Sequence, residues 1–188
     1  MAVLATHITA PVLDRLAMAG INIYAARNTL DWSSAHTLLT DYLDWLKVAG
    51  GIDALQLQPS LQHELANLST WYGPPRGVLL LAYRGSLSVG LVGVQAQGTG
   101  IAEMKRLYVR PTERSSGLGE GLVRAALAAA QNLGAHTLRL VTIPGLMDSA
   151  IGLYRRIGFA PAAQFGDLSL DNSLYLERAV DMSVERAA

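Results

Sequence analysis

Cysteine is absent from the 188-residue sequence. Its absence excludes a disulfide scaffold, an iron–sulfur cluster, a zinc finger and a cysteine nucleophile. Charged residues are scarce at 16%, and the mean hydropathy is positive at +0.25. A membrane-spanning helix nevertheless needs roughly 20 consecutive apolar residues, and stretches such as 78–83 and 125–130 are far shorter. The N-terminus lacks the basic flank of a secretory signal, so we expect a cytoplasmic protein without membrane contact.

Net charge is also absent, because 15 basic residues balance 15 acidic ones. This balance argues against duplex nucleic acid as a partner, since its binding depends on neutralising phosphates. The charge is distributed unevenly, however. Residues 105–124 hold five basic and two acidic residues, a local charge of +3, whereas residues 31–75 hold five acidic residues and one lysine, a local charge of −4. The five acidic residues are Asp31, Asp41, Asp44, Asp53 and Glu64.

Neither a repeat nor a long linker divides the chain, so we expect one domain over residues 1–188, with 1–20 as an N-terminal extension of unassigned structure. Apolar periodicity and breakers predict the following elements: strand 21–25, helices 31–49 and 60–68, strands 78–83, 87–95 and 101–109, helix 116–133, strand 135–143, helix 148–157, and strands 162–165 and 173–177. Gly50 and Gly51 are predicted to end the first helix, and Ser60 to cap the second.

The three strands between residues 78 and 109 are expected to form an antiparallel meander. Residues 101–143 read as strand, helix and strand, which predicts a right-handed parallel crossover. The fold class is therefore α+β, with a mixed central sheet.

The most informative stretch is Val-Arg-Pro-Thr-Glu-Arg-Ser-Ser-Gly-Leu-Gly over residues 109–119, where a strand meets a long helix. Gly117 and Gly119 leave room for a ligand to approach the backbone, and the first helical N–H groups point at it. Arg114 adds donors suited to phosphate oxygens. The stretch is thus a candidate anion site, and its alternative is a glycine-rich turn before a surface helix.

Other chemistries lack their motifs. Neither of the two lysines follows the glycine run of a P-loop, and Leu122 stands where a dinucleotide fingerprint needs its third glycine. No Gly-x-Ser-x-Gly elbow occurs, and the four histidines show no helical pairing. We therefore expect neither a serine hydrolase nor a metal site.

A second motif spans residues 147–159. With Gly158 just past a helix end, Tyr154 and Phe159 occupy the positions of the hydrophobic contact in a Schellman ending. Tyr154 is then a packing residue. Its phenol, with an ordinary pKa near 10, is alternatively suited to protonating a departing thiolate.

Together these stretches resemble the GNAT N-acetyltransferase superfamily, in which Arg/Gln-x-x-Gly-x-Gly/Ala binds the pyrophosphate of acetyl-CoA. Here that motif is Arg114-Ser-Ser-Gly117-Leu-Gly119, with Glu103-Met-Lys-Arg-Leu-Tyr-Val109 upstream and Ala150-x-x-Leu-Tyr-x-x-x-Gly-Phe159 downstream. The resemblance covers about residues 76–177 and implies a three-layer α/β/α fold. Many relatives have Asn where this chain has Met147, so any contact of that Asn is absent.

The resemblance implies roles for specific residues. Tyr154 would protonate the CoA thiolate, and Glu103 would act as the general base, or else be a structural carboxylate paired with Lys105 or Arg106. Acetyl-CoA, with no metal, would contact the strand and the loop through Leu107, Tyr108, Val109, Arg114, Ser115, Ser116, Gly117, Leu118, Gly119 and Glu120.

The implied activity is direct transfer of an acetyl group from acetyl-CoA to a primary amine in a ternary complex, since no cysteine can carry the acyl group. The acidic segment and its three tryptophans suggest the hypothesis of a cationic acceptor, although a solvated helix face with core tryptophans is the explanation that we favour. Two other functions stay open: a non-catalytic acyl-CoA sensor of the same fold, and a nucleotide-binding protein. Edge strands near the C-terminus suggest a homodimer.

Overall fold

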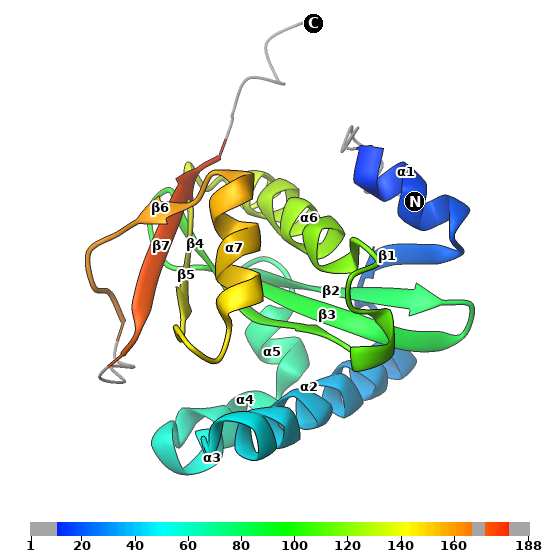
Figure 1. Ribbon diagram of the computed structural model, residues 1–188, viewed down its shortest axis with the longest axis horizontal. Coiled ribbons are helices and arrows are strands. Elements are labelled where there is room, and N and C mark those ends of the chain that lie inside the picture. The colour runs from blue at the N-terminus through cyan, green and yellow to red at the C-terminus, as the bar shows by residue number, and fades with distance from the viewer. Residues whose placement is uncertain (1–10, 167–171, 181–188) are drawn as a thin grey trace, which may run out of the picture.

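The computed structural model describes residues 11–166 and 172–180, and its centre is one seven-stranded sheet in the order β1-β2-β3-β4-β5-β7-β6 (Figure 1). Every neighbouring pair is antiparallel except β4 and β5, which are parallel. The mixed sheet, its meander and its parallel pair are therefore confirmed. The strands are β1 (Ile21–Ala25), β2 (Gly77–Arg84), β3 (Leu87–Ala96), β4 (Ile101–Val109), β5 (Thr137–Thr142), β6 (Ala160–Pro161) and β7 (Leu174–Ala179).

Helices cover both faces of the sheet, which confirms the three layers (Figure 1). One layer consists of α2 (Thr29–Gly50), α3 (Ala54–Leu57), α4 (Ser60–Ala66) and α5 (Leu68–Tyr72). The other consists of α1 (Pro11–Met18), α6 (Leu118–Asn132) and α7 (Asp148–Ile157). Each layer encloses its own apolar core against the sheet. Within the described ranges, no helix is both long and apolar enough to cross a membrane.

Helix α2 begins two residues earlier than the sequence pattern suggests, at Thr29. The Asn28 side chain accepts a hydrogen bond from the Asp31 N–H, and the Asp31 carboxylate accepts one from the Asn28 N–H. This capping box satisfies two donors of the helix start. Gly51 ends the helix as expected, at a left-handed φ of 63°.

Two expectations for the helices and strands were wrong, and one unassigned stretch proved to contain a helix. Ser60 does not cap its helix, because Pro59 holds the N-cap position without a side-chain bond, and the helix ends at Ala66. Residues 162–165 form no strand, since β6 ends at Pro161 and its last backbone bond to β7 runs from the Ala162 N–H to the Tyr175 carbonyl. Part of the unassigned extension is a helix, α1, whose Val12 and Leu16 are buried in the core.

The sheet opens between its two parallel strands. Pairing between β4 and β5 is confined to the first three residues of β4, ending at Glu103 opposite Arg139. Farther along β4 the register with β3 slips by one residue, and Arg106 adopts a left-handed φ of 59°. A bulge of this kind bends a strand and interrupts its ladder. Residues 104–109 thus present a backbone edge without a β5 partner in the described chain.

Candidate active site

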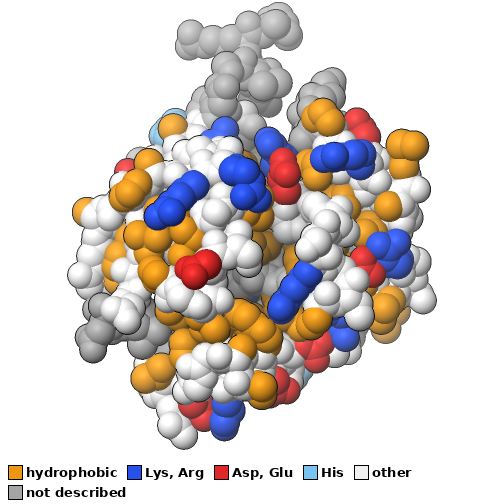
Figure 2. Space-filling view, viewed as in Figure 1, with side chains coloured by type: hydrophobic (Ala, Val, Ile, Leu, Met, Phe, Trp, Pro, Cys, Tyr) orange, Lys and Arg blue, Asp and Glu red, His pale blue; other side chains and the backbone are white. Residues whose placement is uncertain are grey.

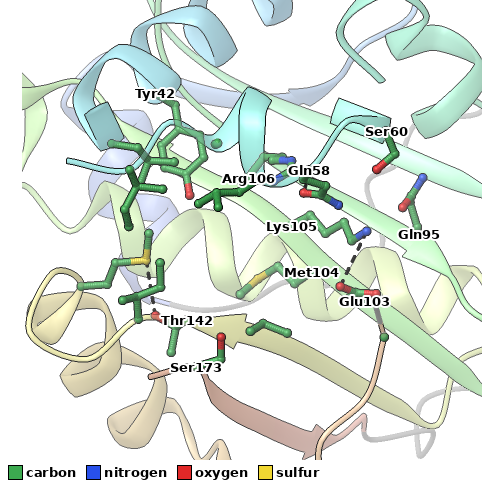
Figure 3. A pocket seen from close by; sticks show the side chains of 18 of the residues that line it. Tyr42, Gln58, Ser60, Gln95, Glu103, Met104, Lys105, Arg106, Thr142 and Ser173 are labelled. Atoms are coloured by element: carbon green, nitrogen blue, oxygen red, sulfur yellow. Dashed lines mark hydrogen bonds and ion pairs between the residues drawn. The ribbon is translucent and has the colours of Figure 1, made fainter. Parts of the chain in front are cut away.

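A cavity of about 630 Å³ lies beside this opening. Its lining comes from α2 to α5, from β3, β4 and the end of β5, and from the chain that follows β5 (Figure 3). Figure 2 shows that the same side of the molecule is hollowed near its centre, with Lys and Arg side chains over α6 and α7. The cavity volume falls in the range of small-molecule sites.

The predicted anion site lies at the start of α6. Ser115 and Gly117 both have positive φ, at 64° and 87°, which turns the chain sharply into the helix. Among the described residues, the N–H groups of Gly119 and Glu120 meet no acceptor, since the first bond back to this loop runs from Gly121 to the Gly117 carbonyl. Free amides at the positive end of a 15-residue helix favour an anion.

Side chains of the loop have partners of their own. The Ser116 hydroxyl donates to the Glu113 carbonyl at 2.7 Å and accepts from the Leu118 N–H at 3.3 Å. Glu120 pairs with Arg124 at 2.8 Å along the helix surface. Leu118 is buried, so this residue would reach a cofactor only through its backbone.

Arg114 does not extend freely into solvent. Its guanidinium lies over the Trp45 ring of α2, 5.3 Å from the centroid, and its Nε donates to the Val109 carbonyl at 3.3 Å. Arg114 therefore joins the loop both to the end of β4 and to α2.

Of the three β4 residues predicted to contact the cofactor, Tyr108 is buried against α2, with its ring 5.8 Å from that of Tyr42. Leu107 and Val109 are half-buried against the other core. All three stand on the edge that β5 leaves unpaired. The Arg110 N–H donates to the Val89 carbonyl of β3, so Tyr108, two residues earlier, also directs its backbone groups toward β3. Leu107 and Val109 alternate with it and can offer backbone groups at the open edge.

Tyr154 lies in the core, and its ring centroid is 5.7 Å from that of Phe159. Both Schellman hydrogen bonds are present, from Phe159 N–H to the Tyr154 carbonyl and from Gly158 N–H to the Arg155 carbonyl. Burial raises the pKa of the Tyr154 phenol, and the neighbouring Tyr42 raises it further. The phenol is therefore protonated at neutral pH. Tyr154 does not itself line the cavity, whereas Tyr42 does.

Glu103 lines the cavity, and its carboxylate lies 3.7 Å from the Lys105 ammonium. Its pairing with Lys105 is thus confirmed. This contact does not test whether Glu103 acts as the base. Arg106, the other suggested partner, is paired elsewhere.

Arg106 belongs to a buried network that the sequence analysis missed. Its Nε and one terminal nitrogen each donate to the Glu64 carboxylate at 2.8 Å, and the Tyr72 hydroxyl donates to the same carboxylate at 2.7 Å. Burial raises the pKa of Glu64, but its bonds to Arg106 outweigh burial and hold the pKa below the usual range. Burial by itself would lower the pKa of Arg106, but its hydrogen bonds to Glu64 and the negative charge of Glu64 raise that pKa above its ordinary value. The sequence did contain a signal for this network. Glu64 stands three residues after Leu61, which is buried, and residues at this spacing share one face of a helix.

The acidic segment is largely neutralised by its own neighbours. Asp41 pairs with Arg110 at 2.9 Å, Asp53 with Lys47 at 3.1 Å, and Asp31 caps α2. Of the five acidic residues, none lines the described cavity. Of the tryptophans only Trp71 lines it.

The acetyltransferase (GNAT) family model matches residues 39–159, which contain the opened strand pair, the loop and α7. The chain belongs to the GNAT acetyltransferase family. An uncharacterized N-acetyltransferase of Schizosaccharomyces pombe is 33% identical over 84% of this chain and 94% of its own. This GNAT chain is therefore an acyltransferase.

Solved structures agree on the fold. An acetyltransferase of Streptococcus agalactiae has a TM-score of 0.70 at 17% identity, covering 85% of this chain and 98% of its own. An N-acetyltransferase of Thermoplasma acidophilum, solved in complex with coenzyme A, has a TM-score of 0.66 at 17% identity over the same shares of the two chains.

Proposed function

We propose that this GNAT protein transfers the acetyl group of acetyl-CoA directly to a primary amine, with both substrates bound at once. The observation that carries the proposal is the row of free amides at the start of α6 beside the unpaired edge of β4. The first suits a diphosphate and the second an extended chain with amide groups. Coenzyme A contains both, and the Thermoplasma acidophilum relative of the same fold was solved with it.

The cofactor would lie along two neighbouring segments. Backbone groups of Leu107 and Val109 would pair with the pantetheine arm, with Tyr108 between them. The loop from Arg114 through Ser115, Ser116, Gly117, Leu118 and Gly119 to Glu120 would hold the diphosphate. The thioester would then reach the cavity near the β4 bulge, and the amine would approach from the side of α2 and α4.

The reaction needs a base and an acid. An alkyl ammonium with a pKa near 10 has no free lone pair at neutral pH, so Glu103 would take its first proton. The amine nitrogen then attacks the thioester carbon, and the carbon–sulfur bond breaks as the amide forms. The departing thiolate receives a proton from Tyr154, whose phenol keeps its proton because burial raises its pKa. Proximity of amine and thioester supplies much of the acceleration.

Binding and turnover test this proposal separately. In a thermal-shift assay at about 100 times the dissociation constant, the true ligand stabilises the fold by roughly 2.7 kcal/mol. We expect that shift with CoA and none with ATP or NAD, and the opposite order would identify a nucleotide-binding protein. Release of CoA thiol from acetyl-CoA, followed over a panel of amines, then tests catalysis. Binding without thiol release from any amine would identify a sensor.

A further inference from the structure

The charges inside the cavity are few. Among the described lining residues, the charged ones are Glu103, Lys105 and Arg106. Arg106 is occupied, because Glu64 takes two of its N–H groups in a fork. One carboxylate and one ammonium group remain, two positions apart on β4 and therefore on the same face of the strand.

These two groups are only loosely paired. Their separation of 3.7 Å exceeds hydrogen-bond length, whereas the Arg106–Glu64 contact is 2.8 Å. Both side chains are mostly buried, with 14% of Glu103 and 20% of Lys105 exposed. Within the described chain, neither side chain makes a hydrogen bond to another residue. Buried charges normally satisfy their hydrogen bonds, so this pair retains an acceptor and a donor for a ligand.

Figure 3 shows where the two groups point. Glu103 and Lys105 extend toward each other at one end of the cavity, near Ser60 and Gln95. The remaining wall is mixed: Gln58, Gln97 and Thr142 contribute polar groups, and an apolar part is formed by Leu46, Ile52, Ala54, Leu57, Met147 and Phe165. The cavity thus places one anion and one cation together and also offers an apolar part of its wall.

We propose that the acceptor is an α-amino acid with an apolar side chain, an inference that rests on the proposed acetyl transfer. Its ammonium group lies at Glu103, its carboxylate at Lys105, and its side chain against the apolar wall. A polyamine fits poorly, since its further charges would meet Lys105 and, among the described lining residues, no second free carboxylate. The acidic segment therefore does not set the substrate class.

The step balances with one proton released. The α-ammonium group gives one proton to Glu103, and its nitrogen bonds to the acetyl carbon. The carbon–sulfur bond breaks, and the sulfur carries away its electron pair and takes a proton from Tyr154. The nitrogen loses its second proton as the amide forms, and this proton replaces the one that Tyr154 gave up. The products are an N-acetyl amino acid and CoA thiol, and Glu103 returns its proton to water.

The experiment compares amino acids with their own amides. Phenylalanine and leucine are each assayed beside phenylalaninamide and leucinamide, with spermidine as a polycation, by thiol release from acetyl-CoA. The amide keeps the amine and the side chain but lacks the carboxylate. In the native protein we expect kcat/KM for the amino acids to exceed that for their amides by roughly 10-fold or more, as loss of a charge-assisted hydrogen bond implies.

Variants of Lys105 decide whether this residue makes the difference. Lys105→Met should abolish the preference for acid over amide, and Lys105→Glu should reverse it, whereas Arg76→Met removes an exposed cation outside the cavity and should keep it. A change at Lys105 that alters Glu103 affects the acid and the amide alike, so it cancels in the ratio of their kcat/KM values. Equal or faster reaction of the amides, or of spermidine, would overturn the inference and leave acetyl transfer standing. No thiol release from any amine would overturn both.

Discussion

Glu64→Gln is the sharpest test of the buried network. The change keeps the size of the side chain but removes the charge that faces Arg106. One guanidinium nitrogen would then meet an amide NH₂ group, a donor facing a donor. Because 2% of Glu64 and 12% of the Arg106 side chain are exposed, water cannot replace the lost partner.

Removing one partner of a buried ion pair costs about 3–5 kcal/mol. For a chain of this length, each kcal/mol lowers Tm by roughly 2–4 °C, so we expect a decrease of roughly 6–20 °C at pH 7. Calorimetry or urea unfolding measures it. Glu113→Gln is the matched control, since Glu113 also binds an arginine through two hydrogen bonds, but that partner, Arg84, is 43% exposed. Its effect should be small.

The pH dependence gives a second readout of the same variant. The pKa of Glu64 in the folded protein lies below its ordinary value of 4.5, so the folded state binds fewer protons than the unfolded state. The stabilisation is then fully present above pH 4.5 and is lost as the pH falls through the folded-state pKa. The difference between native protein and variant should shrink in acid. A Tm equal to that of the native protein at pH 7, or a difference that grows in acid, would refute the reasoning.

Three further changes test the site and its supports. Gly93→Ala should destabilise the fold by about 1–3 kcal/mol in urea unfolding, because a β-carbon there would overlap the Tyr72 ring; an unchanged midpoint would show that the ring moves freely. Gly117→Ala strains a residue at φ 87° by about 1–2 kcal/mol and should raise the KM for acetyl-CoA, and unaltered kinetics would argue against the diphosphate site. Tyr154→Phe should lower kcat by roughly 10²–10⁴-fold with CoA affinity in thermal shifts retained, whereas full activity would leave Tyr154 with packing alone.

Local patterns predicted what depends on local chemistry. The strands predicted at 78–83 and 101–109 lie within β2 and β4, and helix 148–157 was placed at the bounds observed for α7. Gly158 has the positive φ that its Schellman position requires. Each of these features depends on residues within one turn or one strand, so the sequence contains its cause.

Long-range partners were harder to predict. Glu64 and Arg106 are 42 positions apart, and only the folded sheet shows that they meet. The miss at Ser60 was local instead: a capping residue type was not enough, because the neighbouring Pro59 already occupies the N-cap position. The cytoplasmic location, the homodimer and the single domain over residues 1–188 stay predictions.

The contact between Arg114 and Trp45 has an optical consequence. A guanidinium held against an indole alters its fluorescence, and a diphosphate at the start of α6 would compete for that same guanidinium. Titration with CoA should therefore change the emission of Trp45. When the other two tryptophans, Trp32 and Trp71, are replaced with phenylalanine, Trp45 is the one tryptophan that remains to emit. Its fluorescence then reports CoA binding without an added label.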